Sequence, residues 1–361
     1  MSELYIGVMS GTSLDGIDVV ACDIDKESCR LIHSYEYSFD KELKREILNA
    51  IDTLIPIKKI GEIDTRLGEA YAYALEDFLE RFNIPSKKVK AIGLHGQTLW
   101  HEPNSKYPFS MQLANASIIT ARIGICVVCD FRQKDIALGG QGAPFAPAFH
   151  RFLFSKLERS AAVLNIGGIA NLTILGDKEA GYDTGCGNTL LDSWIMQCRG
   201  EAYDKDGDFA KSGKVDTELL EKMLNDEYFK RTPPKSTGRE YFNMSWLASY
   251  LPVFQTLKDE DVQATLLELS AKSIADEVKK ASVDILIVCG GGVKNIYLMK
   301  RLQEMLPSIE VIPSDKLNVS SEFMEAMAFA WLAYKRIHKE TVKLSHITGA
   351  SRDSILGCIY E

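Results

Sequence analysis

The chain has 361 residues, of which 46% are hydrophobic and 25% are charged, and its formal net charge at pH 7 is −8. This length allows two α/β domains with a core each. No segment clusters lysine and arginine, so we expect no nucleic acid as a partner. No apolar run approaches the roughly 20 residues of a membrane span, no secretory signal is recognisable, and the eight cysteines are scattered. These features predict a cytoplasmic protein that binds no membrane.

The first part of the chain combines strand patterns with one long helix pattern. Strand-like runs at Leu4–Met9, Ile17–Ile24 and Leu31–Phe39 predict a meander. Apolar residues between Ile60 and Phe82 then recur at spacings of three and four, which predicts one helix with an apolar stripe. Further strands are expected at Val89–Leu94, Phe109–Leu113 and Ile125–Cys129, and a short helix at Ala114–Arg122.

The second part repeats the opening. Ala161–Ile166 and Asn171–Leu175 predict another hairpin, which suggests an internal structural duplication. The segment Arg231–Asn243 is rich in Pro, Lys, Ser, Thr and Gly and is expected to be an irregular loop. Helices are expected at Asn188–Cys198, Asp216–Leu224, Val262–Lys280 and Met324–Ile337, and a buried strand at Val283–Val288.

Three glycine-bearing turns are candidate phosphate or nucleotide sites. They lie within Ile6–Asp18, Leu164–Thr173 and Val288–Asn295, each directly after a strand. Small residues let backbone N–H groups approach an anion, and hydroxyls add donors. Each turn taken alone is explained equally well by a tight hairpin or a close helix–strand contact. The first turn is no Walker loop, because no Gly-Lys-Ser/Thr follows it.

Taken together, the three turns resemble the two phosphate segments and the adenosine segment of the actin, hexokinase and heat-shock ATPase superfamily. Longer strings resemble one family within it, the anhydro-N-acetylmuramic acid kinases, and extend from Met9 to Asn295. They are MSGTSLDGID, LHGQTLWHEP, DFRQKDIALGGQGAPFAPAFH, LNIGGIANLT, GYDTGCGNTLLD, PPKSTGREYFN, QATLLELSAKSIA and CGGGVKN.

The resemblance implies a two-lobed, actin/hexokinase-like (ribonuclease H-like) α/β fold with mixed sheets flanked by helices and an active-site cleft between the lobes. We expect residues 1–130, completed by the C-terminal helix near 322–361, to form the first lobe. Residues 131–321 are expected to form the second lobe, with the catalytic aspartate and the adenosine segment.

The implied reaction uses ATP and Mg²⁺ in peptidoglycan recycling. Water opens 1,6-anhydro-N-acetylmuramic acid while O6 takes the phosphoryl group, which gives N-acetylmuramic acid 6-phosphate and ADP. The family also implies a homodimer. Two alternatives stay open, an ordinary hexose or amino-sugar kinase and an ATPase binding module like actin or the heat-shock proteins.

The resemblance also assigns roles to residues. Asp183 in GYDTGCGN is the candidate general base, expected on an open turn, and its alternative role is to cap the helix that starts near Asn188. The expected ATP-binding residues are Gly11, Thr12, Ser13, Leu14, Asp15, Gly16, Ile17, Asp18, Asn165, Gly167, Gly168, Gly290, Gly291, Gly292 and Asn295.

The resemblance also implies substrate binding by His95, Gln97, Thr98, Arg132, Gly139, Gly140 and Glu325. Simpler explanations exist for three of them. Arg132 could form a surface ion pair with Asp130 or Asp135, His95 could be a satisfied core residue, and Glu325 could interact with a helix dipole.

No metal ligand is predicted, because Val8 and Asn165 stand where many superfamily members carry an aspartate. Cys126 and Cys129 form a CxxC, which we interpret as two buried thiols because no second pair completes a tetrahedral site. The segment from Lys235 to Arg239 is interpreted as a mobile cationic loop that contacts nucleotide or a second subunit, or as a solvated loop.

Overall fold

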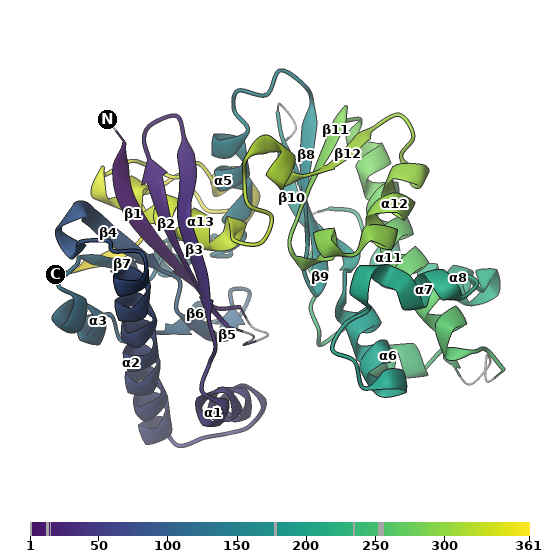
Figure 1. Ribbon diagram of the computed structural model, residues 1–361, viewed down its shortest axis with the longest axis horizontal. Helices are drawn as coiled ribbons and strands as arrows, with labels where there is room; N and C mark the ends of the chain where they lie inside the picture. The colour runs from purple at the N-terminus through teal and green to yellow at the C-terminus, as the bar shows by residue number, and fades with distance from the viewer. Residues whose placement is uncertain (1, 12–13, 15, 177–178, 234, 252–255) are drawn as a thin grey trace. The chain divides into compact units, whose positions relative to one another are not determined.

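The computed structural model describes residues 2–11, 14, 16–176, 179–233, 235–251 and 256–361. The chain forms two compact units (Figure 1). The first consists of Met1–Leu153 and Phe323–Glu361, and the second of Phe154–Glu322.

The first unit contains a six-stranded mixed sheet with the order β13-β7-β4-β1-β2-β3. Strands β1, β2 and β3 form an antiparallel meander, β4 and β7 continue the sheet in parallel with β1, and β13 is antiparallel to β7. The bounds are β1 Glu3–Met9, β2 Ile17–Ile24, β3 Cys29–Tyr37, β4 Val89–Leu94, β7 Val127–Cys129 and β13 Cys358–Tyr360. A separate two-stranded sheet pairs β5 Gln97–Glu102 with β6 Phe109–Leu113.

Helices cover this sheet with their apolar faces. In α2 (Ile57–Arg81), Ile63, Leu67, Tyr71 and Phe78 are fully buried, as the helical spacing predicts. Helix α13 (Met324–Ile337), from the C-terminal part of the chain, packs on β1, β2 and β4. The remaining helices of the first unit are α1 Lys41–Asp52, α3 Ala116–Ile123, α4 Gln133–Ala137, α5 Ala146–Leu153, α13 Met324–Ile337 and α14 Ser345–Thr348.

The second unit contains a five-stranded mixed sheet with the order β10-β9-β8-β11-β12. Its long helix α11 packs on β9 and β10 and against the helices α6, α7, α8 and α12. The strands are β8 Ala161–Ile166, β9 Ile169–Ile174, β10 Ala180–Cys186, β11 Ile285–Cys289 and β12 Glu310–Pro313. The helices are α6 Thr189–Arg199, α7 Asp208–Ser212, α8 Thr217–Leu224, α9 Glu227–Lys230, α10 Met244–Ala248, α11 Asp259–Ala281 and α12 Ile296–Met305.

The two sheets repeat one topology. In each, three antiparallel strands are followed by a fourth and a fifth strand that run parallel to the first and extend the sheet on its other side. A long helix, α2 in one unit and α11 in the other, lies between the third and fourth strands of the repeat. The predicted internal duplication and the α/β class of mixed sheets flanked by helices are therefore confirmed.

The predicted division of the chain after residue 130 is wrong, because residues 131–153 belong to the first unit. Polar contacts with the C-terminal segment explain this. The buried carboxylate of Asp135 accepts a hydrogen bond from the hydroxyl of Thr348 at 2.8 Å, and Arg151 donates to the backbone oxygen of Lys343 at 2.7 Å. These bonds join α4 and α5 to the chain around α14.

Most predicted elements are present, with shifts at their ends. The third strand lies at Cys29–Tyr37 rather than Leu31–Phe39, and β9 spans Ile169–Ile174 rather than Asn171–Leu175. The sequence patterns did not predict strands β5, β10, β12 and β13 or helices α1, α4, α5, α7, α9, α10 and α14. Within the described ranges, no helix combines the length and the apolar character needed to cross a membrane.

Two glycines allow α13 to lie directly on the sheet. A Cβ atom on Gly7 would overlap the backbone oxygen of Ala326, and one on Gly93 would overlap that of Phe329. Both obstacles are helix backbone, which cannot move aside as a side chain can. The close approach of α13 to β1 and β4 therefore requires glycine at both positions.

We expect Gly7→Ala and Gly93→Ala each to lower the free energy of unfolding by about 3 kcal/mol, because the added methyl groups must displace α13. Gly61→Ala is the control, since a Cβ there meets nothing within 4 Å and the residue lies inside α2. That change should raise stability by up to about 1 kcal/mol through helix propensity. Urea denaturation measures all three, and equal effects at the three positions would contradict the packing argument.

Candidate functional site

A row of polar side chains crosses the second sheet. Asn165 on β8 is the register partner of Asn171 on β9, and Asn171 is the partner of Asp183 on β10. Directly opposed residues of antiparallel strands project to the same face, so the three side chains form one row. All three are partly exposed, whereas most of their neighbours in the strands are buried. Asn165 and Asp183 were predicted as site residues from the sequence, whereas Asn171 was not, although it mirrors Asn165 across the Gly167-Gly168 turn.

Asp183 lies in strand β10 and not on an open turn, so that expectation is wrong. The strand is irregular just after it, because the register with β9 shifts between Asp183 and Gly185 and Gly185 has φ 151°. The hydroxyl of Thr184 donates to the backbone oxygen of Ala170 at 3.2 Å, which keeps the strand paired across this irregularity. Asp183 does not cap the following helix, since α6 begins at Thr189 after Asn188.

The loop before α10 fastens Asp183 at its backbone and its side chain. The amide of Asp183 donates to the backbone oxygen of Lys235 at 3.1 Å. The amide of Thr237, two residues further along the loop, donates to the Oδ2 atom of Asp183 at 2.9 Å. The hydroxyl of Tyr228 donates to the backbone oxygen of Asp183 at 2.8 Å. The carboxylate therefore has a fixed orientation, with Oδ2 turned toward the loop.

The surroundings of Asp183 raise its pKa to about 6. Burial is the main cause, because it disfavours the charged carboxylate. The hydrogen bond from the Thr237 amide acts in the opposite direction, and the negative charge of Glu240 raises the pKa further. A carboxylate with a pKa of about 6 is ionised at pH 7 and is a stronger base than an ordinary aspartate.

The burial of the Lys235 side chain contradicts the interpretation of its loop as mobile or solvated. Its ammonium group lies 3.0 Å from the Oε1 atom of Glu277 on α11, and the two side chains are only 2% and 5% exposed. The hydroxyl of Tyr182 donates to the other oxygen of Glu277 at 3.2 Å. Burial alone would raise the pKa of Glu277, but hydrogen bonds from Lys235 and Lys280 hold it below its ordinary value. The loop is thus anchored in the core by a buried ion pair.

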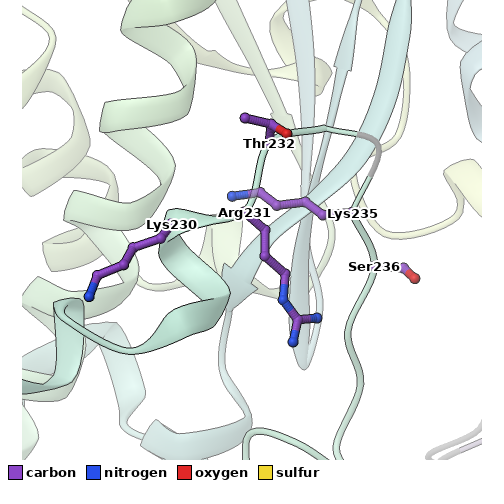
Figure 2. A pocket seen from close by; sticks show the side chains of 5 residues that line it. All are labelled: Lys230, Arg231, Thr232, Lys235 and Ser236. Carbon is purple, nitrogen blue, oxygen red and sulfur yellow. The ribbon is translucent and has the colours of Figure 1, made fainter.

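Beside this anchor lies an open hollow of about 580 Å³ with cationic residues on its wall. Its lining residues are Lys230, Arg231, Thr232, Lys235 and Ser236. Figure 2 shows the side chains of Lys230 and Arg231 diverging from each other. Arg231 stacks on the rings of Tyr228 and Tyr241, with its guanidinium carbon 5.6 and 5.9 Å from their centroids.

The third glycine turn packs against the second hairpin. A Cβ on Gly290 would overlap the side-chain oxygen of Asn165, and one on Gly292 would overlap the side chain of Ile166. The structure therefore brings two of the predicted nucleotide segments together. A Cβ on Gly291 would meet nothing within 4 Å. Asn295 caps α12 by accepting a hydrogen bond from the Leu298 amide at 2.9 Å.

The first glycine turn is described only in part, because Thr12, Ser13 and Asp15 lie outside the described residues. The backbone oxygen of Gly11 accepts a hydrogen bond from the amide of Leu14 at 3.1 Å, and Leu14 has φ 55°. A Cβ on Gly16 would lie 2.8 Å from the side chain of Glu36. Ile17 and Asp18 follow as the first two residues of β2.

The first unit brings His95 and Arg132 together. One guanidinium nitrogen of Arg132 donates to Nε2 of His95 at 2.8 Å, and another donates to the backbone oxygen of Gly142 at 2.8 Å. Because Nε2 accepts this bond, His95 is neutral with its proton on Nδ1. Burial and the charge of Arg132 hold the pKa of His95 well below its usual value. Burial also lowers the pKa of Arg132 to about 10, against the opposing effect of the Glu325 charge.

The remaining predicted sugar-binding residues belong to the first unit and lie in β5, in the loop after α4 and in α13. Gly140 and Gly142 wrap the buried carboxylate of Asp135, which accepts a hydrogen bond from the Gly142 amide at 2.7 Å. Gln97 is buried, and Thr98 accepts a hydrogen bond from Gln112 at 3.2 Å. Gly139 is in the left-handed region, and Glu325 is exposed in the first turn of α13.

All eight cysteines are described and free. Cys126 and Cys129 are half-buried rather than buried, and Cys126 precedes β7. Across the part of the chain that the structure describes, no three or more His, Cys, Asp or Glu side chains gather into a group that could hold a metal ion.

The duplicated sheets, with glycine turns at their strand ends, define the class of the protein. It is an α/β protein of two units, each built on a mixed sheet flanked by helices. The family model described as "Anhydro-N-acetylmuramic acid kinase" matches residues 3–361. The chain belongs to this kinase family, which acts in peptidoglycan recycling.

Similar proteins with this same description match over their whole length. The protein of Sulfurimonas denitrificans is 61% identical over 368 aligned positions that cover 100% of both chains. Those of Sulfurovum sp. and Aliivibrio fischeri are 54% and 49% identical, each with 99% of both chains covered.

Solved structures match at lower identity. An activator of 2-hydroxyisocaproyl-CoA dehydratase from Clostridium difficile with bound ADPNP gives a TM-score of 0.47 at 12% identity, over 94% of this chain and 96% of that one. A ROK family glucokinase from Streptomyces griseus in complex with glucose and AMPPNP gives a TM-score of 0.41 at 14% identity, over 92% of this chain and 99% of that one.

We expect Lys235→Met to lower the free energy of unfolding by about 3 kcal/mol, because it leaves Glu277 buried without its buried partner. Lys280→Met is the matched control. Lys280 lies at the same 3.0 Å from the same Oε1 atom, but its side chain is 63% exposed, so its loss should cost less than about 1 kcal/mol. Urea denaturation at pH 7.5 compares the two, and similar losses would show that burial of the Lys235 pair is unimportant.

Proposed function

We propose that the enzyme uses ATP to convert 1,6-anhydro-N-acetylmuramic acid to N-acetylmuramic acid 6-phosphate and ADP, with Asp183 as the general base. The observation that carries this assignment is the carboxylate of Asp183, oriented by the Thr237 amide and with its pKa raised to about 6. A base is most effective when its pKa lies near the working pH. The family to which the chain belongs supplies the substrate.

The reaction follows from one activated water. Asp183 takes a proton from the water, whose oxygen bonds to the anomeric carbon as the bond from that carbon to the bridging oxygen breaks. The bridging oxygen remains on C6 and attacks the terminal phosphorus of ATP, and the bond to ADP breaks. The product therefore contains one water and one phosphoryl group more than the sugar substrate. The role of the protein is to position these groups and to stabilise the transferred charge.

For ATP we propose the three glycine turns. The phosphates would contact residues 11–18 of the first turn and Asn165, Gly167 and Gly168 of the second, and the nucleoside would contact Gly290–Gly292 and Asn295. The packing of Gly290 against Asn165 supports a shared role for the second and third turns. Gly291, with open space around its Cβ position, leaves room for a flat ring to approach the backbone.

Mg²⁺ would enter with ATP and neutralise phosphate charge. Magnesium at kinase sites is held mainly by phosphate oxygens and water. The polar row suits this arrangement, because Asn165 and Asp183 offer oxygen atoms that can bind its water molecules, and the described residues contain no cluster of acidic ligands.

For the sugar we propose His95, Gln97, Thr98, Arg132, Gly139, Gly140 and Glu325. The buried guanidinium of Arg132 has its fork oriented by His95 and Gly142, which suits a carboxylate such as that of the lactyl group. We further propose that the enzyme works in the cytoplasm, where ATP is available, as a homodimer. The eight free cysteines agree with a reducing compartment.

The direct test is a mass measurement on purified protein incubated with ATP, Mg²⁺ and the anhydro sugar. Ring opening with transfer adds water and a phosphoryl group to the sugar, whereas an ordinary sugar kinase adds the phosphoryl group alone. An ATPase binding module forms no sugar phosphate at all. In water enriched with ¹⁸O, the label should appear at the anomeric carbon and not in the phosphate.

Asp183→Asn should lower turnover by about 10³-fold or more, because the amide cannot accept the proton of the water. Steady-state kinetics with the anhydro sugar measures this loss. Turnover close to that of the parent would remove Asp183 from the role of base.

Thermal unfolding controls for a damaged fold. The pKa of Asp183 is raised on folding, so the ionised carboxylate destabilises the protein increasingly as the pH rises through about 6. At pH 8 this cost is up to about 3 kcal/mol, and Asp183→Asn removes it. The inactive variant should therefore unfold at a higher temperature than the parent at pH 8 and show little advantage at pH 4.

A further inference from the structure

The turn of the second hairpin is in contact with two polar side chains from outside the sheet. A methyl group on the α-carbon of Gly168 would lie 2.6 Å from Oγ1 of Thr189 and 3.4 Å from both Nε and Nη2 of Arg239. The hydroxyl and the guanidinium thus lie against the backbone of the same glycine. A hydroxyl, a cation and a glycine turn together form surroundings suited to an anion.

The hydroxyl of Thr189 is available for a ligand. Its oxygen is buried and has no hydrogen-bond partner within the described residues. The backbone of Thr189 is fixed, because its amide donates to the oxygen of Gly168 at 3.1 Å. Buried polar groups are nearly always hydrogen-bonded, so an unpaired hydroxyl beside a predicted phosphate turn indicates a missing partner.

Arg239 is held in place by the loop that also holds the base. Two residues before it, the amide of Thr237 binds Asp183, and further back Lys235 is anchored on Glu277. The backbone oxygen of Arg239 accepts a hydrogen bond from the side chain of Asn243 at 3.2 Å. One segment of five residues therefore connects the candidate base to the glycine turn.

We propose that Arg239 and Thr189, together with the backbone at Gly168, bind the terminal phosphoryl group of ATP, and that Arg239 is a catalytic residue for its transfer. This inference rests on the proposed function. As the bond from the terminal phosphorus to ADP breaks and the bond to O6 of the sugar forms, negative charge lies on the transferred oxygens. Arg239 stabilises that charge with planar N–H donors and exchanges no proton.

The carboxylate of the sugar is the other anion that a guanidinium could bind. Position favours the phosphoryl group, because the guanidinium of Arg239 lies against Gly168 in a predicted phosphate turn. The first unit already offers Arg132 for a carboxylate, held by His95 and Gly142.

The assignment can be tested by calorimetric titration of nucleotides into the Arg239→Ala variant in the absence of sugar. A non-hydrolysable ATP analogue should bind about 10- to 100-fold more weakly, because one charged hydrogen-bonding partner is lost. ADP, which lacks the terminal group, should bind within about 2-fold of the parent value. Turnover with sugar should fall about 10²- to 10³-fold, and Arg239→Lys should restore it only in part, since lysine lacks the planar fork.

Arg199→Ala is the control, because Arg199 is also an exposed arginine, stacks on the ring of Phe209 and ends α6 at the opposite end from Thr189. It should change neither nucleotide affinity nor turnover, and unchanged melting temperatures of all variants would show intact folds. Equal weakening of the ATP analogue and ADP overturns the assignment, as does unchanged binding of both. Selective weakening of the anhydro sugar would instead assign Arg239 to the carboxylate. Failure of the proposed function is seen separately, as absence of sugar phosphate from the parent protein.

Discussion

The attachment of the Lys235–Arg239 segment to strand β10 is the constraint on which the candidate site depends. The segment is far from β10 in sequence and contains no regular structure, so the strand ladder cannot position it. The buried pair of Lys235 and Glu277 does so from the side of α11. Two hydrogen bonds between the segment and Asp183 then fix the position of the residue and orient its carboxylate. Burial raises the pKa of this carboxylate, although the bond from the Thr237 amide opposes the rise.

Burying an ion pair costs desolvation free energy, because both charges lose their hydration. A hydrophobic pair would hold the loop as firmly. The ion pair adds direction, since Glu277 also accepts from Tyr182, the residue next to Asp183 in β10. The position of the base is thereby linked to both of its neighbours, the loop and α11.

The two sheets share one topology but carry different residues at equivalent strand ends. Val8 and Asn165 occupy equivalent places, opposite Leu94 on β4 and Cys289 on β11. The first unit places an apolar residue there, and the second begins its polar row of Asn165, Asn171 and Asp183 at that place. The base that we propose, Asp183, therefore lies in the second unit, whereas the first unit contains the oriented guanidinium of Arg132.

Local sequence patterns were sufficient for much of the fold. The apolar stripe of α2, the bounds of α13 and the strands β4, β6 and β8 were predicted from spacing alone. Strand β10 was missed because AGYDTGC is rich in glycine, and pairing with β9 is what makes it extended.

Short sequence strings were sufficient to select Asp183 and Arg132 as candidate site residues. The Lys235–Glu277 pair was not, because a lysine in a polar loop and a glutamate on a helix 42 residues away are ordinarily solvated. Only the tertiary fold buries them together.

The pH dependence of kcat/KM for the anhydro sugar tests the central claim most directly, since it reports the ionisation of the free enzyme's base. With Asp183 as that base, activity should fall tenfold per pH unit on the acid side, with its midpoint near the pKa of about 6. A midpoint near 4, the value of an exposed aspartate, or no acid limb at all would contradict the account.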